Sequence, residues 1–297
     1  MMIDASQYLY TLSEQIAQPY IALPTMRAAM VTGSVAKGLA DTYSDIDMTM
    51  YYDAEIPDEE TLLTIRTGHG APERKWTLGD RESGWFAEAY DVAGIEVQIG
   101  HTTVAGWEET MRKVLEELEE FDSPVQKALE GTLACNALYG KDLLNRWKAQ
   151  IANYPPALAE AMVKKHLAFF PVWGLEPHFR TRDATLWYYQ ILVEAAQNLI
   201  GVLAGLNRLY FTTFQFKRMQ YFIDAMEIVP TNLATRLEGV FRQEMSTAVT
   251  ELESLVADTV RLVEQHMPQI DTTAAKRRIG WRIEPWTPRE DALPVTH

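Results

Sequence analysis

The sequence predicts an α+β protein: a small domain built on a mixed β-sheet, residues 1–121, followed by an all-helical domain, residues 122–297. The first observation is that short apolar runs and alternating apolar and polar residues, both typical of strands, are confined to the part of the chain before residue 104. The second is that the pattern after residue 123 is helical throughout. A chain of 297 residues is long enough for two such cores.

The elements of the first domain follow from periodicity and from turn residues. Apolar side chains at helical spacing predict helices over 4–20, 57–67 and 104–121. Short apolar or alternating runs, separated by Gly79-Asp80 and by Gly94, predict strands over 26–32, 45–52, 73–78, 84–92 and 95–101. The second domain is predicted to hold helices over 124–139, 142–152, 156–170, 183–206, 213–227, 232–243 and 245–267.

The overall charge restricts the partners. The formal net charge is −14, whereas proteins that bind long nucleic acids usually present a basic stripe, so such a partner is not expected. An acidic protein attracts a cationic substrate, although the charge can also serve only solubility. The single cysteine, Cys135, rules out an intrachain disulfide and favours the cytoplasm. No membrane span and no signal peptide are expected.

The stretch with the most chemical information is residues 31–50, VTGSVAKGLADTYSDIDMTM. One strand ends at Gly33-Ser34, and the next begins at Asp45-Ile46-Asp47. Side chains at positions i and i+2 of a strand share a face, so Asp45 and Asp47 are predicted to point the same way. Two close carboxylates repel one another, and a divalent cation removes that conflict. Oxygen ligands of this kind suit Mg²⁺. The alternative is a surface turn that happens to hold two aspartates.

The Gly-Ser turn supplies groups that suit a phosphate. Gly33 allows the backbone to approach a ligand closely, and the N–H groups at the start of a helix favour anions. Ser34 adds a hydroxyl, and Lys37 adds a positive charge one turn later. A phosphate cradle beside a carboxylate pair is what metal-assisted phosphoryl or nucleotidyl transfer needs.

The pattern GSxAxG followed by SDID, which begins at Ser44, resembles the signature of the polymerase-beta-like nucleotidyltransferase superfamily. The resemblance implies Mg²⁺, a nucleoside triphosphate such as ATP with Ser44 among its phosphate-binding residues, and a third carboxylate on a later strand. Glu96, on the same side of its strand as Gln98, is the candidate for that metal ligand, with Asp91 as the alternative. An exposed strand glutamate is the other interpretation of Glu96. His101 falls on the opposite face and is predicted to be structural.

The layout also resembles the kanamycin-type aminoglycoside nucleotidyltransferases. This resemblance implies transfer of a nucleoside monophosphate, such as AMP, to a hydroxyl of a small cationic acceptor such as an aminoglycoside. It also implies a role in antibiotic resistance. In that family a glutamate of the helical domain is the general base, and Glu194 is the candidate. Its helix is apolar almost all round, so we expect burial, with Glu194 lining a cleft or joining a polar network with Gln190, Gln197 and Asn198.

A lysine of the helical domain contacts the triphosphate in that family, and Lys217 is the candidate, although a solvated helix face is an alternative. Two other functions stay open. One is a nucleotidyltransferase that modifies a macromolecule, either a tRNA end or a protein. The other is a non-catalytic nucleotide-binding module, against which the retained set of Asp45, Asp47 and Glu96 argues.

Overall fold

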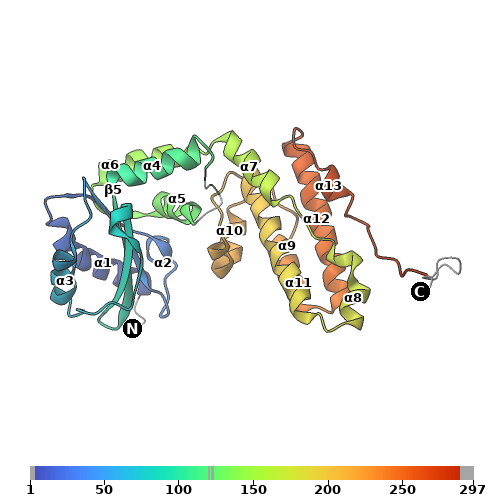
Figure 1. Cartoon of the computed structure of the whole chain (residues 1–297), viewed down its shortest axis with the longest axis horizontal. Helices are drawn as coiled ribbons and strands as arrows, with labels where there is room; N and C mark the ends of the chain where they lie inside the picture. The colour runs from blue at the N-terminus through green and yellow to red at the C-terminus, as the bar shows by residue number, and fades with distance from the viewer. Residues whose placement is uncertain (1–3, 120, 122–123, 288–297) are drawn as a thin grey trace, which may run out of the picture. The chain divides into compact units, whose positions relative to one another are not determined.

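A computed structural model describes residues 4–119, 121 and 124–287 (Figure 1). The chain divides into two compact units. The first contains residues 1–158 and 210–212, and the second contains residues 159–209 and 213–297. The architecture is α+β, a mixed sheet with a helical region, as the sequence predicts.

In the described part of the chain, six strands form one mixed sheet in the order β3-β4-β5-β2-β1-β6. The strands are β1 (Met26–Val31), β2 (Ile46–Tyr52), β3 (Trp76–Asp80), β4 (Trp85–Val92), β5 (Ile95–Thr103) and β6 (Asn136–Tyr139). The pair of β2 and β5 is parallel, and the other neighbours are antiparallel. The chain therefore places β2, which follows the Gly-Ser turn, at the centre of the sheet beside β5.

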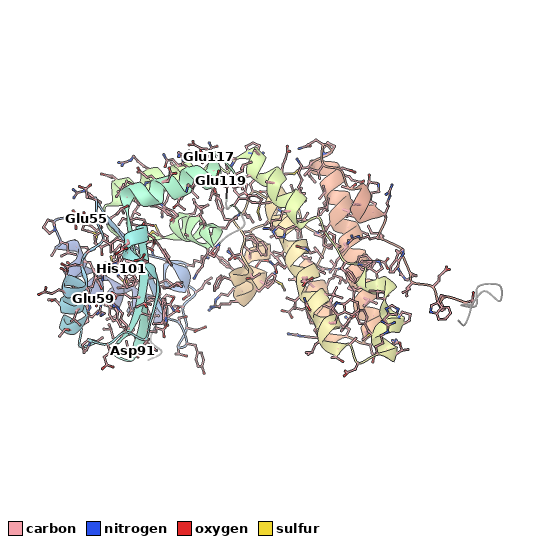
Figure 2. All side chains as sticks on the ribbon, in the orientation of Figure 1. Glu55, Glu59, Asp91, His101, Glu117 and Glu119 are labelled. Carbon is pink, nitrogen blue, oxygen red and sulfur yellow. The ribbon has the colours of Figure 1, made fainter. Side chains whose placement is uncertain are left out.

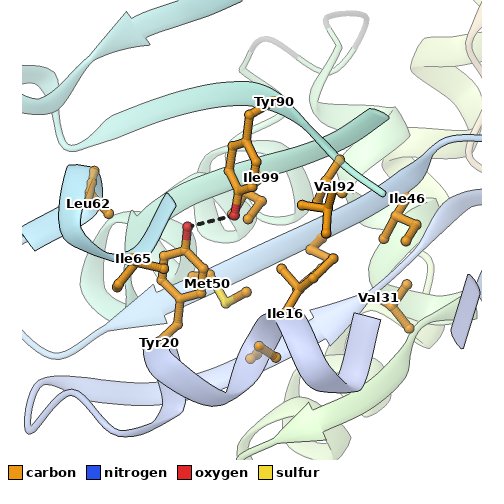
Figure 3. Packing of buried hydrophobic residues seen from close by; sticks show 14 of the residues in the cluster. Ile16, Tyr20, Val31, Ile46, Met50, Leu62, Ile65, Tyr90, Val92 and Ile99 are labelled. Atoms are coloured by element: carbon orange, nitrogen blue, oxygen red, sulfur yellow. Dashed lines mark hydrogen bonds between the residues drawn. The ribbon is translucent and has the colours of Figure 1, made fainter. Parts of the chain in front are cut away.

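One face of the sheet carries the core of the first unit. Alternate residues of β2, such as Ile46, Met48 and Met50, are buried on this face together with residues of α1 (Ala5–Ile21) and α3 (Glu59–Gly68). Figure 3 shows this packing, with the hydroxyls of Tyr20 and Tyr90 3.1 Å apart. Both helices begin at an aspartate whose side chain accepts a backbone N–H of the first turn, and such caps fix where a helix starts.

Helices cover part of the opposite face. Here α4 (Val104–Leu115) packs beside β5 and α6 (Lys141–Ala152) packs beside β1, while α5 (Val125–Ala134) packs on α6. The ring of Tyr51 on β2 is fully enclosed, with the rings of Trp107 and Trp147 centred 6.1 and 4.7 Å away. The amino-terminal end of β2 and strands β3 and β4 keep partly exposed side chains on this face.

The segment 124–139 differs from its prediction. The structure ends α5 at Ala134 and continues as β6, which pairs with β1 at the sheet edge, instead of one helix to residue 139. Because β6, α5 and α6 pack with the sheet, the contacts divide the chain near residue 158 and not at the predicted residue 121. Residues 120, 122 and 123, next to that predicted boundary, lie outside the described residues.

The second unit is helical. It contains most of α7 (Pro156–His166), with η2 (Val172–Gly174), α8 (Glu176–Thr181), α9 (Thr185–Leu206), η3 (Thr213–Arg218), α10 (Met219–Asp224), α11 (Leu233–Arg242), α12 (Met245–His266) and α13 (Thr273–Lys276). Gly201 and Gly205 let α9 approach α7 closely, because a Cβ atom at Gly201 would lie 2.4 Å from the ring of His166.

One helix bears on the expectation that no segment could span a membrane. By length and composition alone α9 is long and apolar enough to do so. However, 67% of its apolar window is buried inside the protein, as in the core helix of a globular unit.

Candidate functional site

The turn between β1 and β2 brings the glycine motif against the second aspartate. Gly33 has φ +64°, a left-handed conformation, and a Cβ atom there would lie 2.3 Å from Asp47 Oδ2. The N–H of Thr32 donates to the carbonyl of Asp47 at 2.8 Å, which ties the two strands together at this point. Glycine is therefore required at position 33 both by the backbone conformation and by the contact with the carboxylate.

Asp45, Asp47 and Glu96 lie on the same side of the sheet, as predicted. Ile46 and Met48 are buried in the core, so by alternation the side chains on either side of Ile46 point to the other face. In the parallel pairing of β2 with β5, Asp47 lies beside Gln98 and Ile46 beside Val97, which sets Glu96 next to Asp45. The Nε2 atom of Gln98 is 2.8 Å from Asp45 Oδ2 and 3.0 Å from Glu96 Oε1, so one amide joins the two carboxylates.

Glu96 also has a cationic partner that the sequence did not indicate. Lys75 Nζ lies 2.9 Å from Glu96 Oε2 and 3.2 Å from Asp91 Oδ1, while Trp76 Nε1 donates to Glu96 Oε1 at 3.4 Å. Asp91 is labelled in Figure 2. The hydrogen bond from Lys75 holds the pKa of Glu96 below its ordinary value, and those from Gln98 and Trp76 act in the same direction, outweighing partial burial. Glu96 is therefore held as a carboxylate.

The donor set fits a cation that takes only part of its ligands from the protein. Among residues 4–119, 121 and 124–287, no group of three or more His, Cys, Asp or Glu side chains is close enough to hold a metal ion. Glu96 thus does not form a three-ligand cluster with Asp45 and Asp47. Mg²⁺ is commonly bound by one or two carboxylates together with waters and substrate phosphates. Asp45 and Asp47 can supply the carboxylates of such a site.

Two of the predicted phosphate-binding residues of the first unit, Lys37 and Ser44, have other partners in the structure. Ser34 is half-buried in the first turn of the four-residue helix α2 (Gly33–Ala36). Lys37 is engaged elsewhere, because its Nζ atom lies 2.6 Å from Glu130 Oε1 on α5. The hydroxyl of Ser44 accepts the N–H of Asp41 at 2.9 Å and so closes the turn that precedes Asp45. Ser44 acts here as a turn residue.

The second unit contains the other two predicted site residues. Glu194 is exposed on α9 and accepts a hydrogen bond from Gln190 Nε2 at 2.9 Å, so its predicted burial is wrong. The reason is that one stripe of α9 is left uncovered, although the helix is apolar elsewhere. Asn198, one turn further along α9, contacts His166 of α7 and the carbonyl of Ala168. Lys217 is exposed on η3, with its Nζ atom 5.5 Å from the centre of the Phe214 ring.

His101 is structural, as predicted, and belongs to a buried ionic network on the core face. Its ring is fully buried, with Nδ1 2.9 Å from the Tyr52 hydroxyl and Nε2 3.4 Å from Glu88 Oε1. Glu88, also fully buried, accepts from Arg66 at 2.7 Å and from Arg74 at 2.5 Å. Both arginines also form ion pairs with Glu59 on α3, which is labelled with His101 in Figure 2. This network underlies β4 and β5 on the face away from the aspartates.

Three residues of the site were missed or undervalued. Gln98 could have been found from its position two residues after Glu96 on the same face. Lys75 and Trp76 could not, because their contact with Glu96 depends on the pairing of β3 with β4 and of β4 with β5. A pocket of about 680 Å³ lies elsewhere in the first unit, between α1, α2, β6 and α6, and its lining contains none of the predicted site residues.

Comparisons with known proteins give little beyond the geometry. No family model matches the chain, and no curated protein matches it. Among solved structures, the chain is similar to a nucleotidyltransferase-like protein from Exiguobacterium sibiricum, with 12% identity and a TM-score of 0.36, over 87% of this chain and 81% of that one.

Proposed function

We propose that this protein is a metal-dependent nucleotidyltransferase. The observation that carries the proposal is the contact of the Gly33 turn with the Asp47 carboxylate, on the sheet face that also bears Asp45. It places the turn, whose backbone N–H groups would suit a phosphate, against Asp47, one of the two carboxylates that would suit Mg²⁺.

The reaction we propose is transfer of a nucleoside monophosphate, AMP from ATP, to a hydroxyl of a small cationic acceptor. The acceptor oxygen forms a bond to the α-phosphorus, the bond from that phosphorus to the leaving pyrophosphate breaks, and the hydroxyl proton passes to a base. Mg²⁺, when bound, neutralises phosphate charge and favours the ionised acceptor oxygen. Asp45 and Asp47 would hold it, and the hydrogen bond from the amide of Gln98 fixes the orientation of the Asp45 side chain.

The acidic surroundings support a cationic acceptor over a polyanion. The net charge is −14, Glu96 is joined to Asp45 through Gln98, and Asp91 lies beside Glu96 with Lys75 as their shared cation. A tRNA end would bring additional phosphates into this region, which its carboxylates disfavour. Binding of an amine would instead use them.

The test is incubation with Mg²⁺ and ATP labelled at the α-phosphate, against aminoglycosides, lincosamides, tRNA and lysate protein. We expect label on a small cationic acceptor in the unaltered protein and none with Asp47→Asn. Asp53→Asn, the same change in an exposed aspartate paired with Arg27, is the matched control and should keep full activity. Full activity of Asp47→Asn would refute the proposal, and label on tRNA or protein would move it to a macromolecular acceptor.

A further inference from the structure

A pocket of about 680 Å³ lies beside the edge strand β6, between α1, α2, β6 and α6. All four elements belong to the first unit. Pockets of roughly 300–1,000 Å³ commonly bind small molecules. Because Asp45, Asp47 and Glu96 do not line this pocket, the proposed reaction gives it no occupant.

One face of α6 forms a wall of the pocket. The residues that line it are Lys141, Leu144, Asn145 and Lys148. Residues at positions i, i+3, i+4 and i+7 lie on one side of a helix, so these four side chains follow one stripe. Leu144 is buried, whereas Lys141 and Asn145 are exposed and Lys148 is partly exposed. The wall therefore presents an ammonium group at each end and an amide between them.

In the part of the chain that the structure describes, the two lysines of this wall, Lys141 and Lys148, form no ion pair. Lys148 Nζ donates to the carbonyl of Cys135 at 2.6 Å, which holds its ammonium group at the end of α5. The acidic residue of the lining, Asp4, is the cap of α1 and accepts a backbone N–H of its first turn. The net charge of the protein is −14, so two cations beside one acid are a local excess of positive charge, which favours an anion.

The side chains that a ligand can reach in the rest of the lining are mostly polar. Gln7 and Asn136 are exposed, like Asn145, and the carboxamides of these three residues can both donate and accept hydrogen bonds. Tyr10 is partly exposed and adds an aromatic ring. A ring compound that carries several hydroxyl or amide groups suits such a lining.

The pair of ammonium groups favours a dianion. A phosphate monoester carries roughly −1.5 to −2 charges at pH 7, more than a carboxylate does. Lysine is a common partner of phosphate, and its flexible stem lets the two ammonium groups of the wall reach one group that lies between them. A phosphate monoester therefore matches Lys141 and Lys148 better than a carboxylate.

We infer that this pocket binds the phosphate monoester of a polar ring compound, either a sugar phosphate or a nucleoside monophosphate. The phosphate lies between Lys141 and Lys148, and the ring lies against the carboxamides of Gln7, Asn136 and Asn145. Gly33 does not line the pocket, so this site is separate from the turn that contacts Asp47 and does not depend on the proposed function.

The test is calorimetric titration of the full chain, without Mg²⁺, with glucose 6-phosphate as the sugar phosphate and AMP as the nucleoside monophosphate. Glucose, adenosine and inorganic phosphate are the reference probes. We expect at least one of the two monoesters to bind with a Kd below about 1 mM, and about tenfold or more tighter than its uncharged parent and than inorganic phosphate. The monoester that binds more tightly identifies the ring as a sugar alone or as a nucleoside.

Lys141→Gln and Lys148→Gln should each weaken that binding by about tenfold, because each removes a charge-assisted contact with the phosphate. Asn145→Phe keeps both lysines and fills part of the pocket with a ring, so it should also weaken binding by about tenfold or more. Lys164→Gln removes the same charge from an exposed lysine of the second unit that is paired with Glu160, and this matched control should have no effect.

Thermal unfolding first establishes that each variant is folded, and Asn145→Phe provides the second measurement if Lys148→Gln is unstable. The inference is overturned if neither monoester binds, if inorganic phosphate binds as tightly as both, or if Lys164→Gln weakens binding as much as the pocket variants. Lys37→Gln tests the other phosphate site: a loss of binding in this variant, with normal binding in the pocket variants, would place the phosphate at the Gly33 turn and would also overturn the inference.

Discussion

The backbone of Gly33 lies so close to the side chain of Asp47 on β2 that residue 33 has no room for a β-carbon. A Cβ atom at this position would lie 2.3 Å from Asp47 Oδ2. Gly33 is the first residue of α2, which follows β1, and Asp47 belongs to β2, so this contact joins the two parts of the motif. The position of the carboxylate therefore depends on the absence of a side chain at residue 33.

This relationship predicts a different outcome for two glycine substitutions. Gly33 and Gly38 have nearly the same left-handed backbone, with φ of +64° and +68°, but a Cβ atom at Gly38 meets nothing within 4 Å. Both Gly33→Ala and Gly38→Ala should cost about 1 kcal/mol of unfolding free energy. Only Gly33→Ala should displace Asp47 and reduce kcat/KM, by about 100-fold. Steady-state kinetics and urea unfolding measure both, and equal activity of the two variants would contradict the prediction.

Glu194 stays a prediction as the general base. Glu194→Gln keeps the shape of the side chain and its contact with Gln190, so ATP binding should be unchanged while the single-turnover rate of transfer falls by roughly 10²-fold or more. Glu238→Gln, in an exposed glutamate of α11 paired with Arg242, is the control. An unchanged single-turnover rate would remove Glu194 from the reaction.

The buried network on the core face predicts a large effect on stability. Glu88→Gln removes the fully buried carboxylate that Arg66 and Arg74 share, and breaking such a pair leaves an uncompensated buried charge. We expect a loss of about 3–5 kcal/mol in the free energy of unfolding, measured in urea. Asp53→Asn, which breaks an exposed pair with Arg27, should change it little. Comparable losses in the two variants would mean that burial of the network is not what stabilises it.

The same network predicts that stability falls in acid. Burial lowers the pKa of His101 and outweighs the opposite effect of Glu88. The unfolded chain therefore takes up a proton near the ordinary value of 6.5 before the folded protein does, and stability declines as pH falls below about 6.5. Burial also lowers the pKa of His69 and of His166, so these residues contribute in the same direction.

Glu88 adds a second step at lower pH. Burial alone would raise its pKa, but the contact with His101, the hydrogen bond from Arg74 and the charge of Arg66 together lower it below 4.5. Its contribution is complete above pH 4.5 and is lost as pH falls through the lower folded-state value. Urea unfolding from pH 7.5 to 4 measures both steps. His101→Gln should flatten the step at higher pH, whereas His266→Gln, at an exposed position, should not. An equal slope of unfolding free energy against pH in both variants would contradict the assignment of that step to His101.

The agreement between predicted and observed elements is closest where the signal is local. The predicted strand over 45–52 corresponds to β2, and the predicted helix over 245–267 corresponds to α12. The segment 124–139 was predicted as one helix because its apolar spacing is helical, yet its last residues form β6. Pairing with β1 at the sheet edge overrides the local preference for a helix in these residues. The sequence of the segment does not indicate that it pairs with β1.

The sequence by itself determined the turn at Gly33 and the shared direction of Asp45 and Asp47, since turn chemistry and the two-residue period of a strand need only neighbouring residues. Only the tertiary structure decided that Gln98 links Asp45 to Glu96, that Lys75 pairs with Glu96, and that Glu194 is exposed. Each of these depends on which strand or helix lies alongside, and that is set by packing between segments far apart in the chain.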